Sequence, residues 1–307
     1  MSIYISIAAY EDPDLVDTIK SALDNARFPD KLVFGICLQY EEEPDLSFLP
    51  KRQKRILSFD AYERPGLVRA RFLLKKMFLK EDYFLQIDSH TVFDKDWDVR
   101  LVKDLNDLKE QKGQNAVLAF QITNTLSMNI KSKTDWIVYQ ECPLILSHNV
   151  WAAVTDDEVE RFEKTQRITA GALFVDAKTI SAIDTDQYTQ AKSEVVYLSF
   201  CFLMNGYDIY TTNNVPISHD NTKYNEHLNS LILKNQPFDE NNNKNFVSNF
   251  YGDAPENEVE MMKALVYNTG KFAVKGAKIT IKDFWEKIGL KDHYESIKKQ
   301  HDKLLYS

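Results

Sequence analysis

The first half of the chain alternates short apolar runs with amphipathic stretches. Residues 2–9 form an apolar, strand-like run, and the stretch up to residue 25 repeats apolar residues every four positions, as one face of a helix does. Asp12 and Pro13 stand between the two, where we expect Asp12 to cap the helix. Further strands are predicted at residues 32–38, 55–59 and 83–87, and a helix at residues 66–79. This alternation predicts an α/β fold with a mostly parallel sheet, which binds ligands at the carboxyl ends of its strands.

The second half is less regular. Strands are predicted at residues 116–120, 172–175, 207–210 and 215–219, and helices at residues 193–205, 256–267 and from Thr280. We therefore expect one α/β domain over residues 1–230, with halves 1–100 and 101–230. An Asn- and Asp-rich flexible segment is expected at residues 231–255, and a helical C-terminal extension at residues 256–307.

Composition excludes several classes of protein. The 307 residues are 44% hydrophobic, so a large core can form, and the net charge of −8 argues against a general electrostatic grip on nucleic acid. The basic run at residues 51–55 is interpreted as a solvated face, with a polyanion contact as the alternative. The three cysteines form no Cys-x-x-Cys pair, which favours reduced, buried thiols. No apolar run approaches the ~20 residues that span a bilayer. We expect no membrane partner and a cytoplasmic location, in a cell or in a phage-infected host.

The triplet Asp88-Ser89-His90 follows the predicted strand at residues 83–87 directly. Side chains two positions apart on extended backbone point the same way, so Asp88 and His90 together can bind one divalent cation. An Asp/His pair suits Mn²⁺ or a similar ion better than Ca²⁺. The same triplet also fits a turn-capping Asp with an exposed His, and at this stage both interpretations stay open.

Several motifs in register resemble a known family. A Gly-hydrophobic-x-Arg-Ala-Arg helix before an Asp-Ser-His motif resembles the polypeptide N-acetylgalactosaminyltransferases. The fuller match is to the cytosolic hydroxyproline N-acetylglucosaminyltransferases and their bacterial and phage relatives. The matching segments are residues 5–13, 25–27, 33–37, 64–71 and 86–93, Trp97-Asp98, and more weakly residues 170–174, Glu194 and 205–208. The resemblance implies a GT-A fold with a nucleotide-binding half over residues 1–100 and an acceptor half over residues 101–230.

The resemblance also implies roles for individual residues. Asp88, His90 and His219 would bind the metal, with Mn²⁺ expected first and Mg²⁺ as the alternative. Asp88 and Glu194 would be the catalytic carboxylates. The nucleotide-sugar site would comprise Ala8, Ala9, Tyr10, Arg64, Arg69, Ser89 and Gly171, with Arg69 ranked before Arg64 for the phosphates.

Each of these roles has a structural alternative. Tyr10 can be a packed turn aromatic, His219 a partly buried imidazole, and Glu194 a first-turn residue that complements a helix dipole. Arg71 or Arg64 can make a structural salt bridge, and we expect Trp97 to pack against the metal-binding loop. The chain departs from the family where Glu194 follows Ser193, instead of standing in a Gly-Glu-Glu run, and where Asp220-Asn221 follows His219.

The implied activity is a metal-dependent, retaining transfer of N-acetylglucosamine, or a related sugar, from a UDP-sugar. The acceptor would be a hydroxyl on a protein or on a hydroxymethylated DNA base. The alternative is a catalytically weak protein that binds sugar or nucleotide on a GT-A scaffold. A nucleotidyltransferase is disfavoured, because residues 8–12 lack a Gly-rich, basic phosphate loop.

Overall fold

The structure is a computed structural model of the 307-residue chain. It describes residues 1–61, 66–120, 130–138, 145–153, 160–168, 171–183, 194–220 and 263–296, together with residues 122, 222–223, 226, 298–299 and 302. The expected flexible segment at residues 231–255 lies outside the described residues, and the expected domain boundaries stay a prediction.

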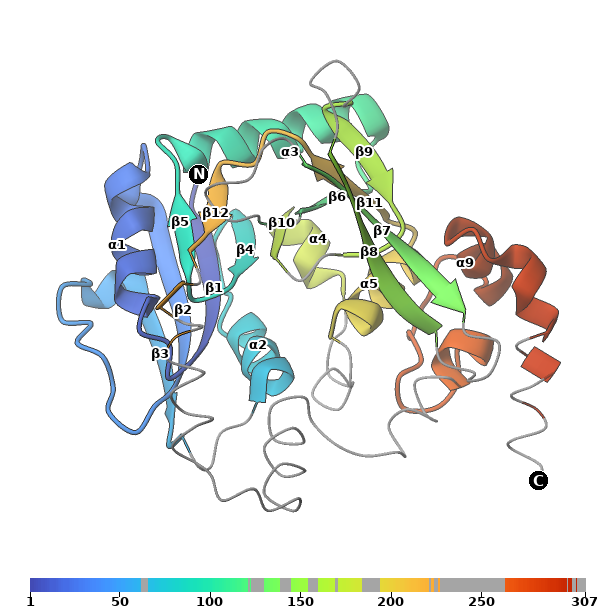
Figure 1. The fold of residues 1–307 in the computed structure, drawn as a ribbon, viewed down its shortest axis with the longest axis horizontal. Helices are drawn as coiled ribbons and strands as arrows, with labels where there is room; N and C mark the ends of the chain where they lie inside the picture. The colour runs from blue at the N-terminus through green and yellow to red at the C-terminus, as the bar shows by residue number, and fades with distance from the viewer. Residues whose placement is uncertain are drawn as a thin grey trace.

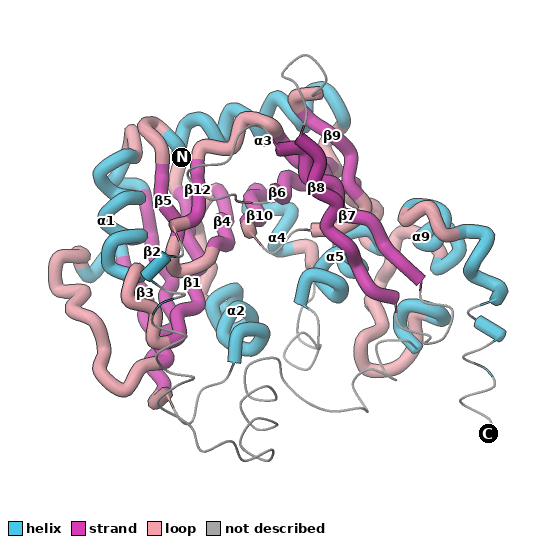
Figure 2. Tube along the Cα trace, in the orientation of Figure 1, coloured by secondary structure: helices cyan, strands magenta, loops and turns pink. Residues whose placement is uncertain are grey.

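An eight-stranded sheet forms the centre of the molecule (Figures 1 and 2). Its order is β3-β2-β1-β4-β10-β6-β11-β9. The strands other than β10 and β9 run parallel to one another, so the predicted mostly parallel sheet is confirmed. The two exceptions are antiparallel to their neighbours, and β10 lies between β4 and β6. The bounds are β1 Ile3–Tyr10, β2 Leu32–Gln39, β3 Lys54–Phe59, β4 Tyr83–Ile87, β6 Ala116–Phe120, β9 Phe162–Thr165, β10 Ala172–Asp176 and β11 Asp208–Thr212.

Helices cover both faces of this sheet because its strands alternate apolar side chains between two cores. On β1, Ile3, Ile5 and Ile7 face the core that includes α1 and α3, whereas Tyr4 faces the core that includes α2 and α5. The second core also takes in α4, α9 and residues 263–267, so the C-terminal residues pack directly against α5. The bounds are α1 Leu15–Asn25, α2 Gly66–Lys76, α3 Trp97–Lys112, α4 Ala177–Ser181, α5 Glu194–Met204 and α9 Ile281–Lys287.

Smaller elements complete the described fold. Strands β5 and β12 form a two-stranded antiparallel sheet, and β7 and β8 form another. Short 3₁₀ helices precede β2 and β3, and a third follows α9. The bounds are β5 Thr91–Phe93, β7 Ile130–Val138, β8 Ile145–Ala153, β12 Ile217–His219, η1 Pro29–Lys31, η2 Lys51–Gln53 and η5 Lys291–His293.

Most predicted elements match the structure within a few residues, and one helix start was wrong. The prediction that Asp12 caps the first helix is contradicted, because Asp14 is the N-cap of α1. The Asp12 carboxylate instead accepts a hydrogen bond from the backbone N–H of Asp14 at 2.9 Å, before the helix begins. The predicted start at Thr280 is confirmed, since Thr280 and Asp283 form a capping box at α9.

Most of the basic side chains at residues 51–55 form ion pairs or hydrogen bonds within the protein. Arg55 pairs with Glu81, Arg52 pairs with Asp30, and Lys54 donates to the carbonyl of Leu46. These contacts attach β3 to its surroundings, which weakens the case for a polyanion site there. Cys37 and Cys201 are buried free thiols, as expected, and Cys142 lies outside the described residues.

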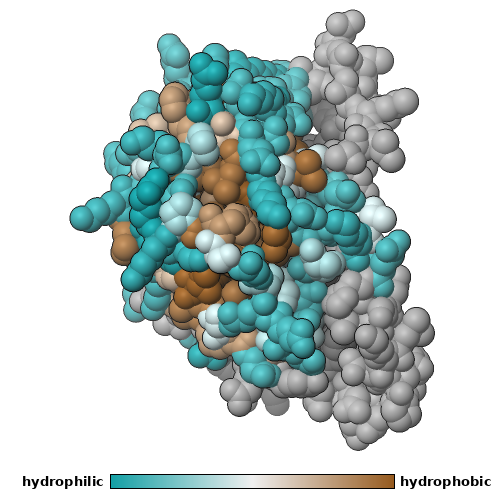
Figure 3. Space-filling model, turned by 90° about the vertical axis from the view of Figure 1, so that its left-hand side faces the viewer, coloured by the Kyte–Doolittle hydropathy of each residue, from teal (hydrophilic) through white to brown (hydrophobic). Residues whose placement is uncertain are grey.

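The outer surface next to α1 is shown in Figure 3, where apolar surface near the centre is surrounded by polar side chains. Among the described residues, Phe28 and Phe48 are large exposed aromatics, and they lie in the loops on either side of β2. Single exposed aromatics are common on protein surfaces. No helix within the described ranges is long and apolar enough to cross a bilayer.

Candidate active site

The loop after β4 is fixed by short hydrogen bonds. The hydroxyl of Thr91 donates to the carbonyl of Asp88 at 2.8 Å, which closes the turn. On α1, the hydroxyl of Thr18 donates to the carbonyl of Ser89 and accepts from the N–H of Thr91, both at 2.8 Å. The turn is thereby attached to a helix at two points, and its side chains stand at the carboxyl edge of the sheet.

The small β5–β12 sheet brings His219 to this loop. Thr91 pairs with His219 across the two antiparallel strands, and the N–H of Asp220 donates to the carbonyl of His90 at 3.1 Å. The rings of His90 and His219 meet edge to face, with centroids 4.9 Å apart. Two segments that are distant in the sequence therefore present imidazoles to the same point.

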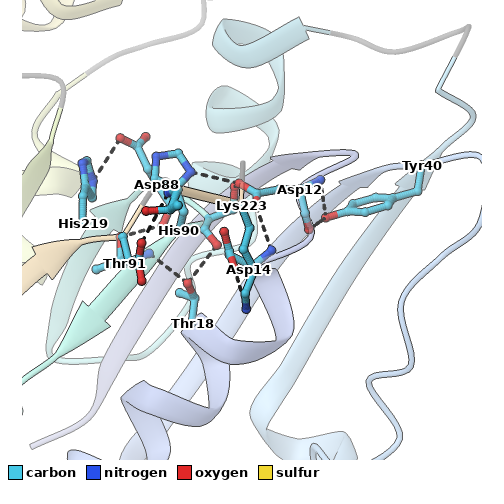
Figure 4. Close-up of polar contacts among 12 residues, drawn as sticks. Asp12, Asp14, Thr18, Tyr40, Asp88, His90, Thr91, His219 and Lys223 are labelled. Atoms are coloured by element: carbon cyan, nitrogen blue, oxygen red, sulfur yellow. Dashed lines mark hydrogen bonds and ion pairs between the residues drawn. The ribbon is translucent and has the colours of Figure 1, made fainter. Parts of the chain in front are cut away.

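Asp88, His90 and His219 form a candidate metal site (Figure 4). One ligand atom from each lies within 4.8 Å of the other two, so the three atoms surround a position that one cation can share. The Nε2 of His219 is buried, makes no hydrogen bond within the described part of the chain, and lies 3.4 Å from Oδ2 of Asp88. A buried nitrogen without a hydrogen bond beside a carboxylate fits a position that binds a cation.

Arg71 holds the other oxygen of Asp88. Its guanidinium, with a side chain only 2% exposed, donates to Oδ1 of Asp88 at 2.6 Å. One carboxylate oxygen is therefore occupied by Arg71, and the other faces His219. Arg69, which was ranked first for the phosphates, is exposed on α2, and Arg64 lies outside the described residues.

Asp12 connects the end of β1 to the triplet. Its Oδ2 accepts a hydrogen bond from the Ser89 hydroxyl at 2.5 Å and lies 3.0 Å from Nδ1 of His90. The Asp12 side chain is 1% exposed, and that of His90 is 14% exposed. Figure 4 shows Asp12 behind the imidazole of His90, on the side away from His219.

The two histidines differ in pKa. Burial, the largest effect on His90, favours its neutral form, but the hydrogen bond with Asp12 and the charges of Asp88, Asp12 and Asp14 outweigh it and raise the pKa. Burial lowers the pKa of His219, and although the charge of Asp88 opposes this, the charges of His90 and Arg71 act in the same direction as burial. The lowered pKa favours the neutral imidazole, which is the form that donates a lone pair to a metal.

The other predicted site residues lie around this centre or outside the described part. Ala8, Ala9 and Tyr10 end β1, and Ala9 is buried whereas Ala8 and Tyr10 are half-buried. Gly171 is buried just before Ala172, which pairs with Ile87, so it lies beside the strand end that carries Asp88. Glu194 is the first residue of α5, and its side chain is not among those described.

Gly171 and Trp97 have clear packing roles. A Cβ on Gly171 would stand 2.6 Å from the backbone nitrogen of Ile122, so the close approach of the two backbones requires glycine. Trp97 is fully buried, and its indole N–H donates to the carbonyl of Ala22 at 2.9 Å. Its ring also packs on Phe93 of β5, so it supports the strand that follows the metal-binding turn.

Two site residues have no predicted site role. The sequence predicts a structural salt bridge for Arg71 and a helix cap for Asp12. Asp12 follows β1 as Asp88 follows β4, and parallel neighbouring strands bring their carboxyl ends together. That rule is a physical signal in the sequence that points to Asp12.

Solved structures share the fold. GalNAc-T7, solved with UDP, GalNAc and Mn²⁺, matches 71% of the chain with a TM-score of 0.50 and 12% identity. The chain spans only 44% of GalNAc-T7. S. aureus TarS 1–349 in complex with UDP-GlcNAc matches 96% of the chain and 73% of its own, with a TM-score of 0.51 and 10% identity. At these identities the likeness shows the fold, and the expected GT-A architecture is confirmed.

The family of the chain is shown by a match of its sequence to a family model. No curated protein matches the chain at a significant level. The model of the glycosyltransferase (GlcNAc) family matches residues 2–57 and 47–294, which together exceed half of the chain. The chain therefore belongs to the glycosyltransferase (GlcNAc) family.

Proposed function

We propose that this glycosyltransferase transfers N-acetylglucosamine, or a closely related sugar, from a UDP-sugar to a hydroxyl acceptor, with retention of anomeric configuration. The observation that carries the proposal is the convergence of Asp88, His90 and His219 at the carboxyl edge of the sheet. A UDP-sugar donor is supported by the complexes of the structural neighbours, since GalNAc-T7 was solved with UDP and GalNAc and TarS with UDP-GlcNAc.

The residues present fit a divalent metal. One carboxylate oxygen and two imidazole nitrogens suit borderline ions, which favours Mn²⁺, with Mg²⁺ second because it prefers oxygen ligands. The buried Nε2 of His219 would gain a partner when a cation binds between it and Asp88. Arg71 helps to orient that carboxylate, because it binds Oδ1 and leaves Oδ2 directed at the site.

When bound, the metal would neutralise charge on the departing diphosphate. The chain's own residues would orient the donor. We propose that Ala8, Ala9 and Tyr10 line the nucleoside pocket and that the exposed Arg69 reaches toward the phosphates.

Retention is proposed from the family resemblance, and it needs no dedicated base if stabilisation of the leaving group carries most of the rate. Glu194 is proposed as a carboxylate near the sugar hydroxyls or the acceptor.

The acceptor is proposed to be a protein hydroxyl, with a hydroxymethylated DNA base as the second candidate. The net charge of −8 disfavours DNA, and three of the four cations in the basic run at residues 51–55 already have partners within the protein. A screen of hydroxyl-bearing peptides against hydroxymethylated DNA, with UDP-GlcNAc as donor, separates these two candidates.

The metal-dependent donor site is tested with Asp88→Asn. This variant keeps an oxygen for Arg71 but removes the negative charge, so it does not leave Arg71 without a partner. We expect wild type to gain thermal stability from UDP only when Mn²⁺ is present, and the variant to lose this gain. Asp24→Asn, on the exposed side of α1, is the matched control and should behave like wild type.

Two results would change the proposal. UDP stabilisation that is unaffected by Asp88→Asn would place the donor elsewhere. Metal-dependent UDP binding by wild type, without transfer to any acceptor and without hydrolysis of the donor, would instead support the catalytically weak binding protein.

A further inference from the structure

We propose that Asp12 is the positioning residue of the metal centre. It holds the Nδ1–H of His90 and thereby directs the lone pair of Nε2 at the metal. The inference rests on the proposed metal site and deepens it, because it assigns a role to a residue outside the three ligands. A metal-ligating histidine commonly donates its second ring N–H to a carboxylate, which fixes both the tautomer and the orientation of the ring.

The first step in the argument is that Asp12 is itself rigidly held. The hydroxyl of Tyr40 donates to the carbonyl of Asp12 at 2.8 Å and accepts from its N–H at 3.0 Å. Burial raises the pKa of Tyr40 and keeps it protonated, so the hydroxyl remains a donor. Oδ1 of Asp12 accepts from the N–H of Asp14 at 2.9 Å, which fixes the carboxylate itself.

The backbone just before Asp12 is also held in a fixed and unusual conformation. Glu11 has a φ of 45°, in the left-handed region that non-glycine residues seldom adopt. Its N–H donates to the carbonyl of Gln39, and its carboxylate accepts from the N–H of Glu41, so the end of β2 holds Glu11 through both its backbone and its side chain. A conformation of this kind persists when the surroundings impose it, and here it delivers Asp12 to the metal-binding turn.

The second step is the direction of the hydrogen bonds. Oδ2 of Asp12 contacts the Ser89 hydroxyl at 2.5 Å and Nδ1 of His90 at 3.0 Å. A carboxylate only accepts hydrogen bonds, so both partners must donate and the proton of a neutral His90 lies on Nδ1. The lone pair of His90 then belongs to Nε2. Asp12 thus selects the tautomer that a metal requires, and it does so from a side chain that is 1% exposed.

The third step separates this role from helix capping. Asp14, and not Asp12, is the N-cap of α1. Asp12 contacts two of the three residues of the triplet through one oxygen, whereas its other oxygen serves the turn into α1. The start of α1 does not require the contacts of Asp12 with Ser89 and His90, so these contacts indicate a second role.

The test is Asp12→Asn. The amide oxygen must face the N–H of Asp14, so the amide NH₂ is left facing Ser89 and Nδ1 of His90. A donor at that position forces the proton of His90 onto Nε2, the wrong nitrogen for a metal, by the same logic as an Asp-to-Asn change behind a catalytic histidine. We expect Mn²⁺ affinity, measured by titration calorimetry on the full chain, to fall about 10–100-fold.

A second readout does not involve the metal. ¹⁵N NMR of the metal-free protein above the pKa of His90, with the resonances assigned through His90→Gln, reports which ring nitrogen carries the proton. We expect the Nδ1–H form in wild type and a shift to Nε2–H in Asp12→Asn. Asp14→Asn removes the same unit charge two residues away without contacting His90, and should keep the wild-type tautomer and weaken Mn²⁺ binding less than about threefold.

The outcomes are distinct. An Nε2–H tautomer in wild type, or Mn²⁺ affinity in Asp12→Asn within about threefold of wild type, would overturn the role of Asp12 and leave the metal site standing. Equal losses in Asp12→Asn and Asp14→Asn would also overturn it, because charge alone would then explain the effect. Failure of wild type to bind Mn²⁺ at all would overturn the metal site, and this inference with it.

Discussion

Gly35 of β2 faces the ring of Tyr4, and the close fit between the two helps to position α2. A Cβ on Gly35 would lie 1.8 Å from the hydroxyl oxygen of Tyr4 and 2.2 Å from the ring carbon that bears it. Tyr4 is fully buried, and its hydroxyl donates to the carbonyl of Leu74 at 2.7 Å. Because Leu74 and Arg71 share α2, this hydrogen bond helps to fix the helix that holds Asp88.

Gly35→Ala should therefore destabilise the protein by displacing the Tyr4 ring. Overpacking a buried site costs about 1–3 kcal/mol, and the buried Tyr4 hydroxyl, which would lose its acceptor, costs about 1–3 kcal/mol more. The Leu74 carbonyl itself keeps the N–H of Met77 as a partner. Alanine in place of glycine in a strand returns about 0.5–1 kcal/mol. The expected net loss is thus about 1–5 kcal/mol in the free energy of unfolding, measured by urea denaturation.

Two second-site variants test the geometry directly. Tyr4→Phe keeps the ring carbons at 2.2 and 2.7 Å from the added methyl group, so it should not rescue Gly35→Ala. Tyr4→Leu removes the ring, and in that background Gly35→Ala should cost less than about 1 kcal/mol, since contacting residues couple in a double-mutant cycle. An equal loss in the wild-type and Tyr4→Leu backgrounds would refute the clash as the cause.

Three further predictions concern stability. Asp98→Ala, which removes a buried carboxylate bound to two backbone amides at 2.8 and 2.9 Å, should cost about 2–4 kcal/mol in thermal or urea unfolding. Burial alone would raise the pKa of Asp176, but hydrogen bonds, first among them one from Lys109, outweigh burial and lower it. The stabilising pair should therefore act fully above the ordinary value of 3.8 and fade as the pH falls through the lower folded pKa. The stability difference between wild type and Lys109→Met should shrink over that range, and a difference independent of pH would contradict this. Thr280→Ala, which removes the capping box with Asp283, should lower stability by about 1 kcal/mol, seen as a small fall in melting temperature.

The central strands were predictable because their hydrophobic pattern is local. Residues 83–87 and 116–120 match β4 and β6 in the structure, and residues 32–38 fall one residue short of β2. Each is an apolar run buried on both faces of a covered sheet, and such a run has few alternatives. The antiparallel insertion of β10 was not predictable in this way, since strand direction depends on the connections and not on composition.

The longest described helix was missed although its pattern was present. In α3, Leu101, Leu105 and Leu108 are buried at the spacing of one helix face, while most of the other positions are charged or polar. Its many charged residues lower its overall hydrophobicity, so the helix is marked by leucines at intervals of three and four and not by an apolar run.

The sequence predicts only the part of the site that lies within one strand end and its turn. Asp88 and His90 share one turn, so their proximity followed from the sequence, but the approach of His219 depends on the pairing of β12 with β5. The sequence likewise does not show which of Arg69 and Arg71, on one helix, reaches the site. Residues two apart on a helix point in different directions, so only one of them can face Asp88, and the choice depends on how α2 packs against β1 and β2. Tyr4 and Gly35 are part of that packing, through Leu74. The identity of the arginine that holds the candidate metal ligand therefore depends on a core contact at Leu74, one turn further along the same helix, which no motif in the triplet encodes.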